Sequence, residues 1–593
     1  MLNRKEIRAD FCVVGGGIAG ICAAIAAARN GAKVVLMHER PVLGGNASSE
    51  IRMWVSGAHG EDNRETGIIE EIALENYYRN PTKNYYIWDT VLYEFVMRES
   101  NITLLLNCTC MDAETEKGEF LDGRTVNIKK ITGYQMTTQT FIDVWADYYA
   151  DCSGDSILAP LTGAEYRIGR ESSEEYGEPT HVEKHDNLTM GMSCLLQGRE
   201  TTQKISFTAP EWSTKLTKEN FENRNLNIHK SSENYWYLEL GGNRDSIHDT
   251  EEISKELIPL AVGTWDYIKN SGEQDADTWD LDFLGFLPGK RESRRMTGEY
   301  TITANDVLGD ARFEDTVAFG GWPIDDHYPD GFYHKGRPNT NILPPAPYSI
   351  PYRCLYSKNV QNLFFAGRYI SMTHMAMSSI RVMATCALIG EAVGTAAAIA
   401  EKYHLTPHGV YKEQLELLQN TLMDNDCMLP HRRRGVGESC RNTELAGGTE
   451  SMKNGEDRPH KMYGSAVCGG SVKNGEGLEY RFENPTPVNA VHIPFNSDVM
   501  RETLPGDKCE RSHMMRSNVQ LSSPVFYVPK TLCKAFVLEV ETAQGWKTVM
   551  ESDRNLKRAN HVAIGESVMA IRLVVKENWG ESEYTDVFSF DFK

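Results

Sequence analysis

The chain has 593 residues, of which 40% are hydrophobic and 24% are charged, and its formal net charge is −21 at pH 7. This length exceeds what one hydrophobic core supports, so we expect about three domains. A surface that follows phosphates needs an excess of Lys and Arg, so the acidic balance excludes nucleic acid and anionic membranes as main partners.

The first predicted unit is a strand, a glycine-rich turn, a helix and a second strand. An apolar run at 10–14 leads into GGGIAG at 15–20, and the alanine-rich run at 18–29 ends at Asn30-Gly31. The next apolar run, 33–38, ends in Glu39, nineteen positions after Gly20 (39 − 20). In such a unit the glycines allow a tight turn and close approach to a pyrophosphate, and the helix start offers free N–H groups. Glu39 can accept hydrogen bonds from the adenosine ribose, so the sequence predicts a dinucleotide site.

Three later segments resemble flavoproteins of the glutathione-reductase and fumarate-reductase type. The glycine pair at 44–45 follows Glu39, and YADCSGD at 149–155 is similar to a strand and turn of these proteins. NLFFAGR at 362–368 precedes a small-residue helix, predicted at 379–400, as in their second FAD segment. The resemblance implies that FAD is the cofactor, with the dipole of this helix stabilising negative charge on the flavin.

Four motifs resemble the FAD-dependent oxidoreductase family that is often found in bacterial carbohydrate-utilisation contexts. They are RESRRMTGEY at 291–300, IPYRCL at 350–355, AGRYISMTH at 366–374 and SIRVM at 379–383. The similarity extends over residues 8–420 and implies an FAD-binding fold with an inserted substrate domain. The other glycine pairs lack a strand-turn-helix context, so we expect no separate NAD(P) domain.

The predicted fold class is α/β, with a Rossmann-like FAD-binding domain of the glutathione-reductase type in two parts, 1–165 and 340–425. Helices are expected at 66–79 and 89–99, and a strand at 102–110. An α+β substrate or cap domain is inserted at 166–339, where we expect a mostly antiparallel sheet and a helix at 251–270. Residues 426–459 are predicted to be a linker, because they are polar and rich in Gly and Asn.

Short strands separated by Gly, Pro and Asn predict a β-sandwich at 460–593. The sequence of this part resembles a galactose-binding-like jelly roll, which leaves both sugar binding and structural docking open.

The predicted cofactor contacts come from the glycine motifs, the strand ends and the loops beside them. They are Gly15, Gly17, Ile18, Ala19, Gly20, Glu39, Arg40, Gly44, Gly45, Asn46, Ser48, Arg52, Cys110, Ser153, Gly154, Asp155, Gly367, Arg368, Ser379 and Ile380.

The predicted catalytic groups are histidines that can move a proton near neutral pH and arginines that can stabilise an anion. They are His374, His327, His59, Arg294, Arg295 and Arg381. Trp54 and Trp322 can stack on a sugar face. For each of these residues a structural role, such as an ion pair or core packing, stays open.

We expect hydride transfer between the flavin and a polar hydroxylated small molecule of carbohydrate type, with an electron acceptor of unknown identity. One alternative is a fumarate-reductase-like enzyme acting on a carboxylate, and another is a carbohydrate-binding protein with a structural flavin. A homo-oligomer is compatible with the sequence.

Thirteen cysteines are an odd number, and Cys12, Cys22 and Cys386 lie in apolar runs, which predicts reduced buried thiols. Cys108 and Cys110 lack a second cysteine pair, so no metal site is expected.

Residues 382–400 contain Glu391 and many small residues, which predicts a packed helix and no membrane span. We expect a cytoplasmic protein, or a periplasmic one if a leader peptide has been removed from the natural chain.

Overall fold

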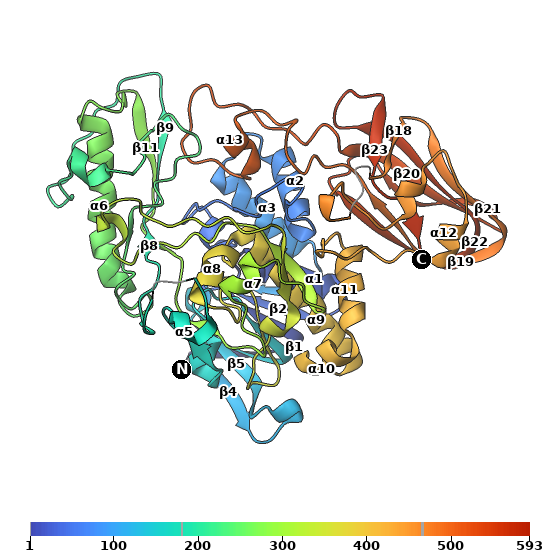
Figure 1. Ribbon diagram of the computed structural model, residues 1–593, viewed down its shortest axis with the longest axis horizontal. Helices are drawn as coiled ribbons and strands as arrows, with labels where there is room; N and C mark the ends of the chain where they lie inside the picture. Colours follow the sequence, from blue (N-terminus) through green and yellow to red (C-terminus); the bar gives the residue numbers. More distant parts are fainter. Residues whose placement is uncertain (1, 180–181, 464–467) are drawn as a thin grey trace. The chain divides into compact units, whose positions relative to one another are not determined.

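The structure is a computed structural model that describes residues 2–179, 182–463 and 468–593. These residues belong to two compact units, which are drawn in Figure 1. The first consists of the chain up to His59, together with Thr82–Leu415 and His513–Pro524. The second consists of Gly60–Pro81, Glu416–Ser512 and Val525–Lys593. The chain therefore passes between the units five times, after residues 59, 81, 415, 512 and 524.

A mixed sheet forms the centre of the first unit. Its parallel strands lie in the order β3 (Ile102–Leu105), β2 (Val34–Met37), β1 (Asn3–Val14), β6 (Thr140–Asp151) and β16 (Leu363–Phe365). The antiparallel strands β5 (Val126–Gln135) and β4 (Cys108–Lys117) continue the sheet beside the first half of β6. Every residue of β2 is buried and apolar, as parallel strands covered on both faces require. The predicted α/β class with a Rossmann-like parallel sheet is confirmed.

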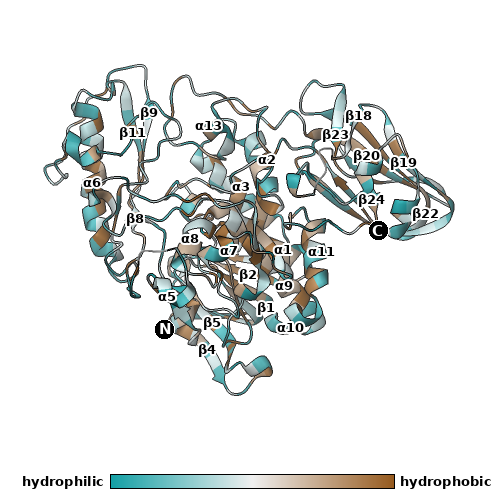
Figure 2. Cartoon of the chain, in the orientation of Figure 1, coloured by the Kyte–Doolittle hydropathy of each residue, from teal (hydrophilic) through white to brown (hydrophobic). Residues whose placement is uncertain are grey.

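Two apolar helices join the distant parts of this fold. They are α1 (Ile18–Arg29) and α9 (Met383–Tyr403), and both are hydrophobic along much of their length in Figure 2. A Cβ atom at Gly390 would lie 2.1 Å from the carbonyl oxygen of Ala19. One at Gly394 would lie 2.0 Å from that of Ala23, so only glycine permits this helix contact. The contact packs α9, near the end of the region 8–420 that resembles the flavoprotein family, against α1, near the beginning of that region.

The segment between β6 and β16 forms several small antiparallel sheets among its described residues. Their strands are β7 (Tyr166–Arg167), β8 (Met192–Ser193), β9 (Leu196–Glu200), β10 (Glu239–Leu240), β11 (Trp279–Leu284), β12 (Gly289–Lys290), β13 (Arg295–Met296), β14 (Thr316–Gly320) and β15 (Tyr348–Pro351). The expected larger sheet is divided because the chain turns between β8 and β9. As a result β8 pairs with β10 and β12, whereas β9 pairs with β11. The amphipathic helix α6 (Thr250–Asn270) lies close to its predicted position, and its alternating colours are visible in Figure 2.

The second unit contains an antiparallel β-structure. Its strands are β17 (Leu445–Ala446), β18 (Gly470–Lys473), β19 (Gly477–Pro494), β20 (Cys533–Thr542), β21 (Gly545–Ser552), β22 (Ala559–Asn578), β23 (Tyr584–Val587) and β24 (Asp591–Phe592). The main sheet has the order β17-β19-β22-β20-β21, with β24 beside β19, and β18 pairs with β23 in a second sheet. The core between them contains Phe495, Phe536 and Leu573, each with no exposed surface.

The described residues contain ten further α-helices. They are α2 (Ile68–Arg79), α3 (Tyr85–Met97), α4 (Leu158–Thr162), α5 (Ser173–Tyr176), α7 (Ala304–Leu308), α8 (His374–Ile380), α10 (Pro407–Glu413), α11 (Leu415–Asp424), α12 (Glu438–Asn442) and α13 (Lys508–Ser512). Helix α3 begins four residues before the predicted helix at 89–99 (89 − 85), because the Asn84 side chain caps it by accepting from the N–H of Tyr86.

Residues 426–459, which we expected to be a linker, pack within the second unit. Arg434 is buried and donates to the carboxylates of Asp591 and Asp457. Arg458 is also buried and donates to the backbone carbonyls of Asp62 and Arg64. The polar composition of this stretch therefore reflects buried charge pairing.

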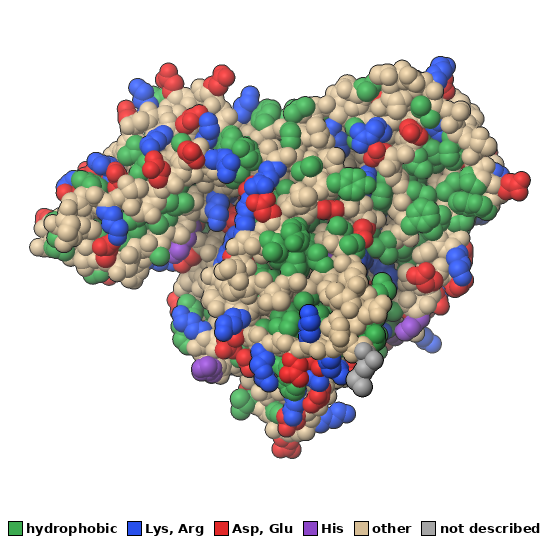
Figure 3. All heavy atoms as spheres, turned by 180° about the vertical axis from the view of Figure 1, so that it is seen from behind, with side chains coloured by type: hydrophobic (Ala, Val, Ile, Leu, Met, Phe, Trp, Pro, Cys, Tyr) green, Lys and Arg blue, Asp and Glu red, His purple; other side chains and the backbone are tan. Residues whose placement is uncertain are grey.

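Charged side chains of both signs are interspersed over the face shown in Figure 3, with hydrophobic side chains between them.

All thirteen cysteines lie in the described ranges, and none of them forms a disulfide. Within the described ranges, one helix, α9, is long and apolar enough to span a membrane, but 94% of its most apolar window is buried inside the protein. This burial is that of a core helix.

Candidate active site

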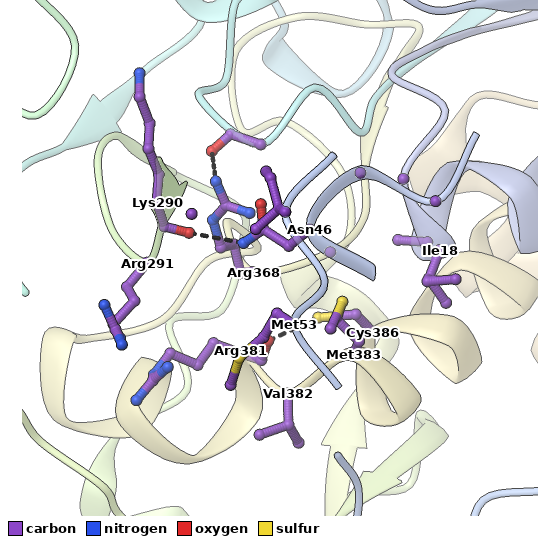
Figure 4. A pocket seen from close by; sticks show the side chains of 18 of the residues that line it. Ile18, Asn46, Met53, Lys290, Arg291, Arg368, Arg381, Val382, Met383 and Cys386 are labelled. Atoms are coloured by element: carbon purple, nitrogen blue, oxygen red, sulfur yellow. Dashed lines mark hydrogen bonds between the residues drawn. The ribbon is translucent and has the colours of Figure 1, made fainter. Parts of the chain in front are cut away.

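A cavity of about 280 Å³ in the first unit is lined by segments that are far apart in the sequence. Thirteen of the predicted cofactor residues line it, namely Gly15, Gly17, Ile18, Ala19, Glu39, Arg40, Gly44, Gly45, Asn46, Ser153, Gly154, Gly367 and Arg368. In Figure 4, Ile18 lies at one end of the view, and the guanidinium groups of Arg291 and Arg381 lie together at the other. We call these the nucleotide end and the substrate end.

The backbone of the glycine-rich turn shapes the nucleotide end. Gly15 has a φ of +109°, and a Cβ there would lie 2.3 Å from the carbonyl oxygen of Cys152. A Cβ at Gly17 would meet nothing within 4 Å, although Gly17 lines the cavity, so this glycine leaves room for a ligand. Gly17 is also the N-cap of α1, and no side chain caps the helix. The exposed N–H groups and the open space fit the pyrophosphate of a dinucleotide.

His38 holds the turn in this shape. The N–H of Gly16 donates to His38 Nδ1 at 3.0 Å, so that nitrogen carries no proton, and Nε2 lies 3.0 Å from the carbonyl oxygen of Val42. Burial and the charge of Arg40 lower the pKa of His38 to about 4. The ring is therefore neutral at ordinary pH and keeps both contacts.

In the middle of the cavity, the loop after the glycine pair at 44–45 contacts the chain at Lys290, and two of the FAD-like segments contact each other. Asn46 donates to the carbonyl oxygen of Lys290 at 3.0 Å, and Arg368 donates to that of Gly154 at 2.9 Å (Figure 4). The N-cap of α9, Val382, offers no side-chain cap, and Met383 and Cys386 in the first turn line the cavity. A second uncapped helix start thus faces the same space, where its dipole favours negative charge.

The substrate end contains a buried histidine between two carboxylates. His327 Nδ1 lies 2.6 Å from Glu239, and its Nε2 lies 3.4 Å from Asp325. Burial lowers the pKa of His327, but the two carboxylates outweigh this effect, so the pKa lies above its usual value. Burial raises the pKa of Glu239, but Arg291 and His327 outweigh it and lower the pKa to about 2. Glu239 is therefore ionised and fixes a proton on His327 Nδ1.

Two arginines complete this cluster. Arg381 Nη2 lies 3.2 Å from both His327 Nε2 and the Asp325 carboxylate, and Arg291 lies 3.3 Å from Glu239. In the neutral ring Glu239 holds the proton on Nδ1, so Nε2 is unprotonated. Arg381 contacts this Nε2 atom. Of the predicted catalytic residues, His327 and Arg381 line the cavity together.

Aromatic rings border the same end. Trp54, Trp236, Trp322 and His513 line the cavity. Trp54 is 4.3 Å from His513 between ring centroids, and Trp236 is 4.8 Å from His327. The indole Nε1 atoms of Trp54 and Trp322 are buried without a hydrogen-bond partner among the described residues.

His374 lies outside the cavity lining, in a buried ion-pair network. Its Nδ1 is 3.0 Å from Glu292 and its Nε2 is 2.9 Å from Asp326. Burial lowers the pKa of His374, but these two carboxylates outweigh it and raise the pKa to about 10. A permanently protonated imidazole that does not face the cavity is poorly suited to acid–base catalysis. His374 instead joins Glu292 and Asp326. These two residues directly follow Arg291 and directly precede His327 in the sequence.

The other predicted catalytic residues are also placed elsewhere. Arg295 is 1% exposed and pairs with Glu292 and Glu171, in the same network as His374. Arg294 donates to the carbonyl oxygen of Asp155, and His59 packs edge-on to Trp322 without lining the cavity.

Seven predicted cofactor residues do not line the cavity. They are Gly20, Ser48, Arg52, Cys110, Asp155, Ser379 and Ile380. Several have clear structural partners. Arg52 pairs with Asp282 at 3.1 Å, Asp155 pairs with Lys290 at 2.8 Å, and Ser379 lies 2.6 Å from the hydroxyl of Tyr348. For these three residues the structure shows a structural contact in place of the predicted cofactor contact.

Sequence reasoning did not single out several lining residues, namely Met53, Ser193, Asn234, Trp236, Lys290 and His513. Lys290 directly precedes the family-like run at 291–300, so extending that motif by one residue would have found it. Trp236 lies in the inserted segment, for which the sequence predicted only a fold. His513 lies in the segment that returns to the first unit from far along the chain, and no local pattern marks it.

The glycine turn and the two uncapped helix starts are features of dinucleotide-binding oxidoreductases with a Rossmann-like fold. A model of the family described as FAD dependent oxidoreductase matches residues 10–422. The chain belongs to this family, and FAD is its cofactor. No curated protein matches the chain.

Several solved structures share low similarity with the chain. An E. coli quinol fumarate reductase variant is 12% identical, with 71% of this chain and 75% of that chain covered and a TM-score of 0.27. p-Nitrophenol 4-monooxygenase from Pseudomonas putida is 11% identical, with coverages of 71% and 89% and a TM-score of 0.31. A family 32 carbohydrate-binding module from Streptococcus pneumoniae is 14% identical, with coverages of 26% and 97% and a TM-score of 0.17. The family match, and not these similarities, supports the assignment.

Proposed function

We propose that this FAD-dependent oxidoreductase acts on a polar hydroxylated small molecule of carbohydrate type, with His327 moving the proton that accompanies hydride transfer. When bound, FAD supplies the hydride acceptor or donor. The observation that carries the proposal is the contact of His327 with Glu239, on the wall of the cavity that the glycine turn opens. The mixed polar and aromatic lining supports a substrate with several hydroxyl groups.

The residues of the substrate end suit the oxidation of an alcohol. Glu239 keeps the proton of the neutral ring on Nδ1, which leaves Nε2 as the atom that accepts the hydroxyl proton. The imidazolium formed in this way is stabilised by Glu239 on one side and Asp325 on the other. Arg381, which contacts Nε2 directly, can stabilise the developing alkoxide. In the reverse direction His327 returns the proton to the carbonyl oxygen.

The first test is anaerobic bleaching of the bound flavin by a panel of sugars and dicarboxylates. Sugars or sugar derivatives should reduce the flavin, and His327→Gln should slow this reduction while FAD stays bound. His248→Gln is a matched control, because His248 also pairs with a carboxylate, Asp245 at 2.8 Å, but is exposed and outside the cavity. Reduction by His327→Gln at the rate of the control would remove His327 from the mechanism.

A second candidate function is reduction or oxidation of a dicarboxylate. The adjacent guanidinium groups of Arg291 and Arg381 favour it, since arginine binds carboxylates well. Flavin redox change with dicarboxylates and not with sugars would select this alternative.

A further inference from the structure

Unpaired hydrogen-bond donors collect at the substrate end. Trp54 Nε1, Trp322 Nε1 and Arg381 Nε are buried and have no partner among the described residues, and all three residues line the cavity. They come from the loop after the second glycine pair, the loop after β14 and the end of α8. Buried donors in folded proteins are nearly always satisfied. The site is therefore built to receive acceptor oxygens from a ligand.

The charges of the cluster point to an anionic ligand. Arg291 and His327 share Glu239, and Arg381 and His327 share Asp325. Lys290, at the cavity wall, is paired with Asp155. When His327 takes up a proton, three cations face two carboxylates. An uncompensated charge in a buried site is unfavourable, so a negative group on the substrate would balance the cluster.

We propose that the substrate is a hydroxylated carboxylic acid of sugar size, such as a uronic or aldonic acid. Its carboxylate binds Arg381 Nε beside Arg291, and its hydroxyl oxygens accept from the indole N–H groups of Trp54 and Trp322. In the oxidation, a C–H bond breaks with its electron pair passing to the flavin. The hydroxyl proton passes to His327 and a carbonyl forms, so the flavin is the oxidant of this half-reaction. The inference rests on the proposed function and adds the substrate class.

The test compares each acid with its neutral parent on the full-length protein with FAD bound. Calorimetry measures the binding of D-glucuronate, D-gluconate, D-glucose and succinate, and anaerobic flavin bleaching measures reduction by the same compounds. A charge-assisted contact is stronger than a neutral one, so we expect the sugar acids to bind about tenfold or more tightly than glucose.

Arg381→Gln should remove this preference, because it should weaken the binding of the acids much more than the binding of glucose. The matched control is Arg244→Gln, because Arg244 forms a partly exposed ion pair with Glu256 outside the cavity. This variant should keep the full preference for the acids.

The outcomes separate this inference from the proposed function. Glucose binding as tightly as the acids, with flavin reduction by glucose, would overturn the inference and leave the proposed function standing. Binding and flavin redox change with succinate alone would overturn both. Equal loss of preference in Arg381→Gln and Arg244→Gln would show that Arg381 does not contact the carboxylate.

Discussion

The two ends of the cavity are built in different ways. The nucleotide end comes mainly from one short run, the turn between β1 and α1, and its shape depends on the backbone of Gly15 and Gly17. The substrate end takes side chains from β8, the loops around β10 and β14, the end of α8 and the segment that contains His513. Backbone geometry leaves a contiguous signal in the sequence, whereas a side-chain cluster assembled by folding leaves none.

The sharpest test of the nucleotide end is Gly17→Ala. A methyl group there meets no protein atom within 4 Å, so folding should be unaffected, but it enters the space left for the pyrophosphate. We expect FAD affinity to fall by about a hundredfold or more, with loss of activity, since close backbone approach is what this glycine permits. Equilibrium titration of the apoprotein with FAD measures the change. Gly118→Ala, which lies outside the cavity and has room for a Cβ, should bind FAD normally. Normal FAD binding by Gly17→Ala would contradict the assignment of the nucleotide end as the site of the FAD pyrophosphate.

At the substrate end, we expect the largest effect from a change at His327. Its replacement by Gln should lower the rate of flavin reduction by about 10²- to 10⁴-fold, the usual contribution of a general base. In the wild type the rate of substrate oxidation should rise with pH through a value above 6.5, because the carboxylates raise the pKa of His327 and the neutral ring is the base. Stopped-flow reduction across the pH range checks both statements. A flat profile would contradict the role.

His374 sharpens the comparison, because it is also a histidine between two acids but lies outside the cavity. We expect His374→Gln to reduce the rate of flavin reduction much less than His327→Gln does. It should lower the free energy of unfolding by about 3–5 kcal/mol, since Glu292 and Asp326 would lose a buried partner. Chemical denaturation measures the loss. A larger effect on flavin reduction than that of His327→Gln would return His374 to the mechanism.

The pH dependence of stability tests the same network. The pKa of His374 is about 10 in the folded protein and near 6.5 when unfolded, so its ion pairs stabilise the fold fully below pH 6.5. This contribution is lost as pH rises towards 10. The wild type should therefore lose more stability over this interval than His374→Gln does, and parallel curves would contradict the assigned pKa.

Trp322→Phe should have the smallest effect. It removes an indole N–H that has no protein partner and keeps an aromatic ring, so stability should change little. Substrate affinity should fall by about fivefold, the equivalent of one hydrogen bond. Trp279→Phe is the control, since Trp279 also has an unpaired buried Nε1 but lies outside the cavity. Equal effects of the two variants on substrate affinity would show that Trp322 does not contact the substrate.

Local patterns predicted the fold well where backbone constraints are strong. The β1-turn-α1-β2 unit and the packing of α9 follow from runs of glycine, alanine and apolar residues. The start of α3 was missed because its cap, Asn84, precedes an aromatic run that also suits a strand. The segment at 426–459 was misread as a linker, since Arg434 pairs with Asp591 in the distant strand β24 as well as with Asp457 in the segment itself.

The candidate catalytic residues show the limit of sequence reasoning. His374, one of the predicted catalytic residues, ends the family-like run at 366–374 that begins in the second FAD-like segment. Whether a side chain faces a cavity depends on neighbours such as Glu292 and Asp326, which come from a distant part of the chain. The same reasoning places His327 only within a glycine-flanked loop, and its partner Glu239 was not identified.

The five crossings between the units have a consequence for protein engineering. No single cut can release the carboxyl-terminal β-structure intact, because α2 belongs to it and lies near the amino terminus. A truncated protein that ends near residue 425 would also lack His513, which lines the cavity of the first unit. Neither unit therefore corresponds to one continuous stretch of the chain that can be removed or exchanged as a block.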